Sequence, residues 1–137
     1  MIVRLDEELL RAAIEARENA YAPYSNFKVG AAFRLKNGDI HTGVNVENCA
    51  LPLSVCAERN AVASIAASGA RHGDVVSVVI VLDSPTEGSP CGACRQVMAE
   101  FMELKCQVVV HNLRDRSFYR MTLGDLLPKA FTPKSLE

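Results

Sequence analysis

The sequence predicts a three-layer α/β/α sandwich around a mixed sheet of about five strands. Residues 75–82 are an almost continuous run of Val and Ile, which is typical of a strand covered on both faces. Segments with strand and helix patterns alternate along the chain, as in layered α/β folds. The Asn37-Gly38 pair between two strand-like segments indicates a tight hairpin. We expect the strands joined by helical crossovers to run parallel, with right-handed connections.

The first half is predicted to form a helix, a hairpin and a second helix. Apolar residues at helical spacing run from Leu5 to Ala20, with Asp6 as the N-cap. The hairpin strands are expected at 28–35 and at about 39–46. Residues 56–68 are rich in Ala, which predicts a helix buried on most sides, and Gly69 is a natural stop.

The second half is predicted to add three strands and a further helix. After the strand at 75–82, residues 83–90 form a polar loop and residues 91–102 have a helical pattern. Residues 106–111 are β-branched and predict a strand, 117–121 a short edge strand, and 123–127 a helical turn. A chain of 137 residues fits one core, so we predict a single domain over 1–137.

Composition excludes several classes of function. Fifteen basic and sixteen acidic residues give a formal charge of −1, so no broad basic surface is available for a nucleic acid. No segment approaches the roughly 18 consecutive apolar residues that span a bilayer. The first twenty residues contain five acidic ones and lack the pattern of a secretory signal. We therefore expect a cytoplasmic protein without a nucleic-acid or membrane partner.

Three of the five cysteines have the spacing of a metal site. Cys56 opens one predicted helix, and Cys91 and Cys94 lie three residues apart at the start of another, so both thiols of the pair share a helical face. Helix N-termini favour the thiolate form that binds metal. Three thiolates leave one tetrahedral position open for water, the arrangement that distinguishes a catalytic zinc from a structural one.

Two residues beside the first ligand have predicted roles. Glu58 lies two residues after Cys56, where its carboxylate can reach the bound water and transfer protons without binding the metal. Arg59 is a candidate for tuning the charge of the thiolates by hydrogen bonds. In the alternative hypothesis, the zinc is structural and Cys49 or Cys106 completes a four-cysteine site. Otherwise these two thiols are expected to act as small buried apolar residues.

The chain resembles the small homotetrameric zinc-dependent cytidine deaminases over nearly its whole length. The matching blocks occur in the family's order, and they are YAPYSNFKVGAA (21–32), GVNVEN (43–48), CAER (56–59), SPCGACRQ (89–96) and LLPKAF (126–131). The resemblance implies one Zn²⁺ per chain and attack of zinc-bound hydroxide on C4 of cytidine or deoxycytidine. The products would be ammonia and uridine or deoxyuridine, as in pyrimidine salvage, and Glu58 would protonate N3 and later the amine.

The resemblance also implies roles for substrate-binding residues. Phe27 would pack on the base, Asn45 and Glu47 would bind the ribose 3′-hydroxyl, and the backbone of Ala57 would meet the pyrimidine carbonyl. Phe131 would enter the site of a neighbouring subunit, so that active sites are shared within a homotetramer.

One residue departs from the family pattern. Leu51 stands where the family commonly has an aromatic residue near the sugar, so preference among nucleosides can differ. Deamination of a related amino-heterocycle or a nucleoside antibiotic is therefore an alternative, although Asn45 and Glu47 favour a ribose.

Overall fold

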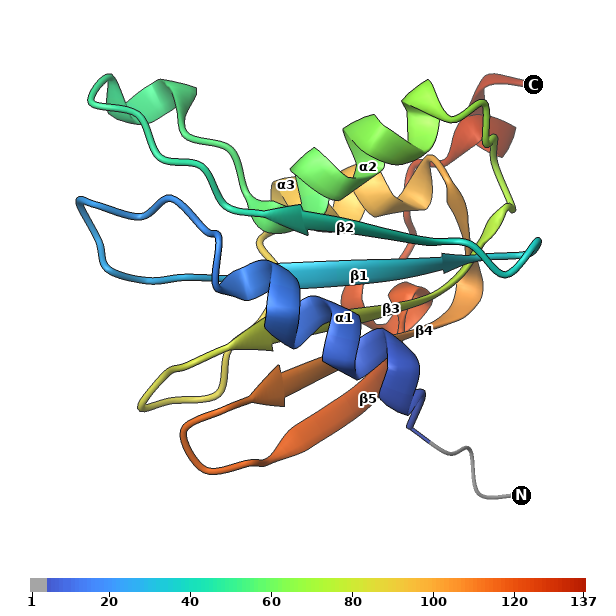
Figure 1. Ribbon diagram of the computed structural model, residues 1–137. Helices are drawn as coiled ribbons and strands as arrows, with labels where there is room; N and C mark the ends of the chain where they lie inside the picture. The colour runs from blue at the N-terminus through green and yellow to red at the C-terminus, as the bar shows by residue number, and fades with distance from the viewer. Residues whose placement is uncertain (1–4) are drawn as a thin grey trace.

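The computed structural model describes residues 5–137, so the first four residues of the predicted domain lie outside it. A five-stranded mixed sheet has the strand order β2-β1-β3-β4-β5 (Figure 1). In chain order the elements are α1 (Glu7–Arg17), β1 (Gly30–Leu35), β2 (Ile40–Val44), a 3₁₀ turn (Leu51–Leu53), α2 (Ala57–Ala67), β3 (Val75–Leu82), α3 (Gly92–Ala99), β4 (Met102–Asn112), β5 (Phe118–Thr122), α4 (Leu123–Leu126) and a 3₁₀ turn (Pro133–Leu136).

The direction of each strand confirms the predicted mixed sheet. β1 pairs antiparallel with both β2 and β3, β3 pairs parallel with β4, and β4 pairs antiparallel with β5. The crossover through α3 therefore joins parallel neighbours. Gly38 closes the β1–β2 hairpin at a φ of 94°, a left-handed conformation that glycine adopts without steric cost. The Asn37-Gly38 prediction is confirmed.

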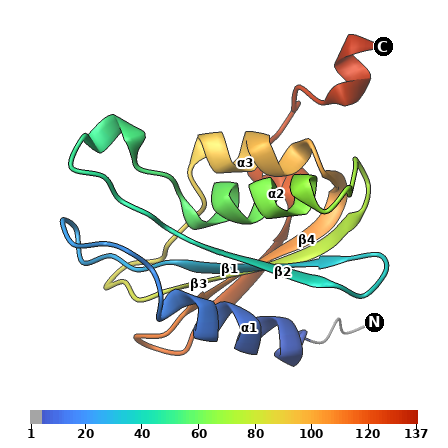
Figure 2. The same cartoon turned by 45° about the horizontal axis from the view of Figure 1, so that its top comes forward.

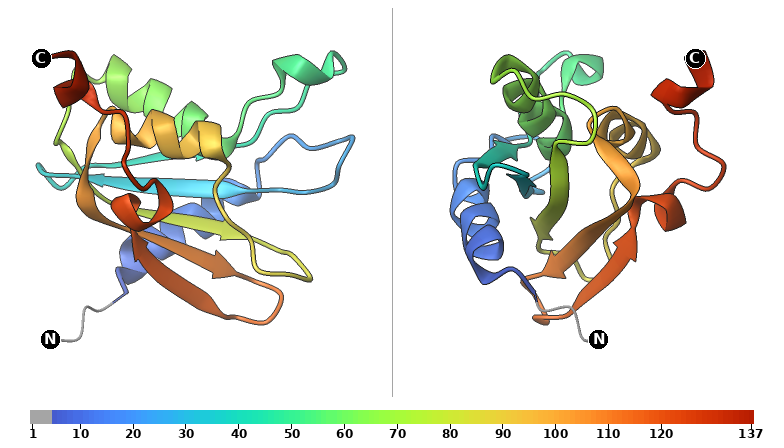
Figure 3. Two further views of the ribbon diagram at one scale, coloured as in Figure 1. Left: turned by 180° about the vertical axis from the view of Figure 1, so that it is seen from behind. Right: turned by 90° about the vertical axis from the view of Figure 1, so that its right-hand side faces the viewer.

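Helices cover both faces of the sheet, as the sandwich prediction requires. α1 lies on one face, and α2 and α3 lie side by side on the other (Figures 2 and 3). The larger core cluster fills the α2/α3 side and includes Phe33, Ile65 and Met98, all fully buried. Leu9 and Val81 belong to the smaller cluster beneath α1. None of the helices within the described residues is long and apolar enough to cross a membrane.

Several element boundaries differ from the sequence predictions, among them the start of β1, the end of β2 and the junction between α3 and β4. Helix α3 ends at Ala99, and Met102, predicted to be helical, begins strand β4. Residues 102–105 alternate between buried or half-buried apolar side chains and exposed charged ones, which is the period of a strand. Strand β1 begins at Gly30 instead of Lys28, and the N–H of Val29 bonds the side chain of Asn45 in place of a ladder partner.

Loops from distant parts of the sequence gather at one end of the sheet. The connections before β1, after β2, after β3 and between β4 and β5 all lie at the end opposite the 36–39 hairpin (Figure 1). The first turns of α2 and α3 face the same end. This convergence places both cysteine motifs beside the loops.

Candidate metal centre and substrate cavity

Helix α2 begins with two residues of the predicted site. Cys56 is its N-cap residue and Glu58 lies in its first turn. Strand β2 sits unusually close to this turn: a Cβ built on Gly43 would lie 2.3 Å from the carbonyl oxygen of Ala57 and 2.5 Å from the N of Ala61. Only glycine permits this approach. Gly43 therefore sets the distance between the sheet and the helix that carries Cys56 and Glu58.

Helix α3 presents the second cysteine motif in the same manner. Cys91 is its N-cap residue, and its Sγ accepts a hydrogen bond from the backbone N of Cys94 at 3.4 Å. The Arg95 guanidinium donates to the carbonyl oxygen of Pro90 at 2.8 Å and to Oγ of Ser89 at 2.6 Å. These bonds hold the backbone immediately before Cys91.

The three predicted thiols converge on one point. The Sγ atom of Cys91 lies 4.0 Å from that of Cys56 and 3.3 Å from that of Cys94. All three ligand atoms lie within 4.8 Å of one another. A tetrahedral zinc with Zn–S bonds of about 2.3 Å requires sulfur atoms about 3.8 Å apart, so the thiol group fits this ion.

The four-cysteine hypothesis receives no support from the site. Within residues 5–137 neither Cys49 nor Cys106 belongs to the group of ligand atoms that could hold a metal. Cys49 is exposed on the loop after β2, so the prediction that it is a small buried residue is wrong. Cys49 lies between Asn48 and Ala50 in a surface turn, in which Oδ1 of Asn48 accepts a hydrogen bond from the N of Ala50. Cys106 is half-buried on β4 beside the carbonyl oxygen of Val75.

The electrostatics of the site depend on burial. Glu58 is 4% exposed, and burial raises the pKa of its carboxyl group. Burial also raises the pKa of Cys56 and of Cys94, and the nearby charge of Glu58 raises the pKa of Cys94 further. At Cys91 burial acts in the same direction, but hydrogen bonds from Cys94 outweigh it and lower the pKa. A buried carboxyl group with a raised pKa holds a proton more readily than an exposed one, which suits a group that transfers protons.

A cavity of about 330 Å³ opens directly over the thiols and Glu58. Its apolar walls include Phe27, Ile80 and Leu82. Asn45 and Ala57, both predicted substrate contacts, also line it. The volume is in the range of small-ligand sites, and its combination of apolar walls with a few polar groups is typical of them.

Asn45 and Glu47 hold the loop that carries Phe27. Oδ1 of Asn45 accepts from the N of Val29 at 2.8 Å. Oε1 of Glu47 accepts from the N of Tyr24 at 3.0 Å and from the N of Ser25 at 3.1 Å, and these bonds, with one from the Ser25 hydroxyl, lower the pKa of Glu47. Sequence reasoning assigned Ser25 no role, because nothing local reveals a partner 22 residues away.

Glu47 does not line the cavity, and two further predicted residues, Arg59 and Phe131, also lie outside it. Arg59 is exposed on α2, and no hydrogen bond joins it to the three thiols among the described residues. Phe131 is 59% exposed, and its carbonyl oxygen accepts a hydrogen bond from Nε2 of Gln96 at 2.8 Å. The predicted roles of both residues, charge tuning and contact with a neighbouring subunit, stay predictions.

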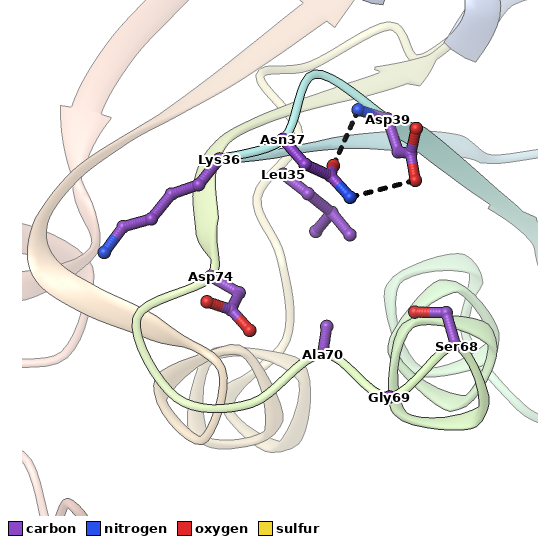
Figure 4. A pocket seen from close by; sticks show the side chains of 8 residues that line it. All are labelled: Leu35, Lys36, Asn37, Asp39, Ser68, Gly69, Ala70 and Asp74. Atoms are coloured by element: carbon purple, nitrogen blue, oxygen red, sulfur yellow. Dashed lines mark hydrogen bonds between the residues drawn. The ribbon is translucent and has the colours of Figure 1, made fainter.

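A second cavity of about 290 Å³ lies at the opposite end of the sheet. Figure 4 shows its lining, in which Asn37 bonds Asp39 across the hairpin and Lys36 extends away from Ala70. Neither a thiol nor a buried carboxylate lines this cavity. The candidate metal ligands Cys56 and Cys91 and the buried carboxyl group of Glu58 line the first cavity instead.

The chain is similar to known proteins over the residues that form this site. The family described as "Cytidine and deoxycytidylate deaminase zinc-binding region" matches residues 3–111. Cytidine deaminase from Halalkalibacterium halodurans is 44% identical over 93% of this chain and 95% of its own length. The Sporosarcina psychrophila enzyme is 42% identical over 95% of this chain and 93% of its own. A crystal structure of cytidine deaminase from Burkholderia pseudomallei superposes with a TM-score of 0.87 at 44% identity, covering 93% of this chain and all of that chain.

Proposed function

The chain belongs to the cytidine and deoxycytidylate deaminase family, and from this premise we propose that it converts cytidine and deoxycytidine to uridine and deoxyuridine with release of ammonia. One observation carries the proposal: thiols from two helix starts converge beside a buried carboxyl group at a cavity of about 330 Å³. We place the reaction in pyrimidine salvage and assign it to a single zinc-dependent domain spanning the chain.

The reaction consumes one water: a C4–O bond forms and the C4–N bond to the amino group breaks. Cys56, Cys91 and Cys94 would hold one zinc ion, which when bound polarises water for addition to C4. Glu58 accepts one proton as water adds and donates it to N3. It then takes the second proton from the new C4 hydroxyl and delivers it to the amine, which departs as ammonia while the C4 carbonyl forms. Burial raises the pKa of Glu58, which favours its protonated form in the steps where it donates a proton.

The residues around the cavity explain recognition of a nucleoside. Phe27 lies on the apolar wall, where its ring can pack on the base, and the backbone of Ala57 can meet the pyrimidine carbonyl. Asn45 and Glu47 bind the ribose 3′-hydroxyl with the hydrogen-bonding capacity that the Phe27 loop leaves free. Among the described residues, Oε2 of Glu47 accepts only from the Ser25 hydroxyl and Oδ1 of Asn45 only from the N of Val29, so each of these oxygens keeps a lone pair for the ribose.

Charge favours a nucleoside over a 5′-nucleotide. The charged side chains that line the cavity are Glu58 and Glu87, and its lining among the described residues contains neither Lys nor Arg. A phosphate group needs cationic or N–H donors to offset its charge. Within a family described for both cytidine and deoxycytidylate, this chain therefore takes the uncharged substrate.

Assembly into a homotetramer would complete the site. Exposed apolar side chains lie on the loops before β1 and after β2, which project from the end of the sheet that holds the cavity (Figure 1), and exposed apolar groups of this kind are typical of an interaction surface. They are Tyr21, Tyr24, Leu51 and Leu53, which are 53–67% exposed. Phe131, exposed on the C-terminal segment, would enter a neighbouring subunit's site, so each active site would be shared.

An ultraviolet assay tests the proposed function. Zinc-loaded protein is mixed with cytosine, cytidine, deoxycytidine and cytidine monophosphate, and the absorbance change and ammonia release are recorded. We expect turnover of the two nucleosides with little or none of the base and the nucleotide. No turnover of either nucleoside at high enzyme concentration removes the assignment.

A further inference from the structure

The segment Asp83–Pro90 forms one wall of the substrate cavity without regular secondary structure. It links β3 to the metal ligand Cys91, and most of its residues line the cavity. The shape of an irregular segment is fixed by side chains that satisfy its backbone groups. The partners of these groups therefore decide where the wall stands.

Asn112, at the end of β4, bonds the first part of this wall. Its Oδ1 accepts from the N of Ser84 at 3.1 Å, and its Nδ2 donates to the carbonyl oxygen of Ser84 at 2.8 Å. The same Nδ2 reaches the carbonyl oxygen of Thr86 at 3.5 Å. Asn112 is only 7% exposed, and apart from Glu58 it is the one buried polar side chain within residues 5–137. A buried amide that bridges two backbone groups fixes their relative position.

Tyr119, on β5, bonds the middle of the wall. Its hydroxyl donates to the carbonyl oxygen of Gly88 at 2.7 Å. Gly88 also lies directly on Leu82, since a Cβ built on it would lie 2.2 Å from a Leu82 methyl carbon. Gly88 therefore packs against Leu82 at the end of β3, and the Tyr119 hydroxyl holds its carbonyl group in place.

A separate side chain holds the last part of the segment. Arg95 bonds Ser89 and Pro90, the two residues that precede Cys91, and also the carbonyl oxygen of Leu126. The metal ligand is thereby secured independently of Asn112 and Tyr119. Loosening the wall at 84–88 should leave the thiol group assembled.

We propose that Asn112 and Tyr119 are positioning residues for nucleoside binding, which act by holding the 84–88 wall against the base. The inference rests on the proposed function. Neither residue lines the cavity. The wall contacts the bound nucleoside in the ground state and the transition state alike, so loosening it raises KM and leaves kcat nearly unchanged.

Two variants test the proposal. Tyr119→Phe removes one hydroxyl and keeps the ring, and we expect KM for cytidine to rise about three- to tenfold. Asn112→Asp keeps the acceptor for Ser84 N but places a carboxylate oxygen against the Ser84 carbonyl, and we expect a larger rise. In both variants kcat stays within about twofold and zinc stays near one per chain. Hydrogen exchange of the 83–90 peptide should accelerate without substrate, while α2 keeps its protection.

Ser68→Ala is the matched control. Its hydroxyl donates to the carbonyl oxygen of Ile65 at 2.6 Å, at the end of α2 remote from the wall, so the variant loses one similar bond and should keep the wild-type KM. A wild-type KM in Tyr119→Phe, even with a lowered melting temperature, overturns the proposal. Zinc loss in parallel with activity in Tyr119→Phe also overturns it. If the wild type itself deaminates no nucleoside, the proposed function fails, and hydrogen exchange still tests the wall.

Discussion

The side-chain amide of Asn45, the residue that follows β2, donates a hydrogen bond to the carbonyl oxygen of Phe27, the residue proposed to pack on the base, at 2.7 Å. The Oδ1 atom of the same side chain accepts from the N of Val29 at 2.8 Å. One polar side chain therefore spans the backbone on both sides of Lys28. The orientation of the aromatic wall depends on it.

Substitution of Asn45 should affect both stability and binding. In Asn45→Ala the N–H of Val29 loses its partner, which we expect to lower the free energy of unfolding by about 1–3 kcal/mol. Phe27 becomes mobile and kcat/KM for cytidine falls. Asn60→Ala is the matched control, because Asn60 donates one hydrogen bond to the carbonyl oxygen of Val44, the residue before Asn45, and has none to the Phe27 loop among the described residues. Equal KM values in Asn45→Ala and wild type would contradict this role.

Glu58→Gln should separate an enzyme from a structural zinc module. The amide cannot relay protons, so kcat is expected to fall by about 10²- to 10⁴-fold. The three thiols are unchanged, so metal analysis should still find one zinc per chain. Retention of wild-type turnover would remove Glu58 from the mechanism.

Metal binding can be measured without activity. Added zinc should raise the melting temperature of metal-free wild type, because the ion binds the folded thiol group more tightly than the unfolded chain. Cys56→Ser should lose most of this rise. Cys49→Ser and Cys106→Ser should retain it, since neither residue joins the group. A full loss of the zinc-dependent rise in melting temperature in either control variant would support the four-cysteine hypothesis.

Gly43→Ala tests the close approach of β2 to α2. The new methyl would lie 2.3 Å from the Ala57 carbonyl oxygen, so the helix must shift. We expect a loss of about 1–3 kcal/mol in the free energy of unfolding and weaker zinc binding, because Cys56 moves with the helix. A Cβ on Gly92 would meet no atom within 4 Å, so Gly92→Ala should keep wild-type stability in the same thermal melts.

Asp6 should stabilise the fold in a pH-dependent way. Its carboxylate accepts from the N of Leu9 at 3.0 Å as the N-cap of α1 and pairs with Arg34 at 2.8 Å. The Arg34 hydrogen bond is the main cause of its lowered pKa. The pKa of Asp6 is lower in the folded state than in the unfolded chain. The stabilisation is therefore complete above the unfolded pKa of about 3.9, and it is lost as the pH falls through the folded pKa.

Denaturant melts of Asp6→Ala should show this dependence. At pH 7 we expect a loss of about 1 kcal/mol in the free energy of unfolding. The difference between wild type and variant should shrink as the pH drops below about 4. A difference that stays constant between neutral and strongly acidic pH would show that the charge of Asp6 contributes nothing.

The sequence by itself determined the features that depend on local signals. The Asn37-Gly38 pair specified the hairpin, and the Val-rich run at 75–82 specified the central strand with the bounds observed. Cys56 and Cys91 were placed at helix starts because capping and composition act within a turn or two of the chain. The α/β alternation then left few topologies for the sheet.

The tertiary structure alone decided the contacts made across long separations. Met102 joined β4 rather than α3 because its burial against the sheet outweighs the helical pattern before it. Asn112 and Ser84 are 28 residues apart, and nothing near either residue indicates the bond between them. A side chain that bonds the backbone of a distant segment produces no repeating pattern in the sequence from which its partner could be predicted. Their partners are set only when the sheet brings the two strands together.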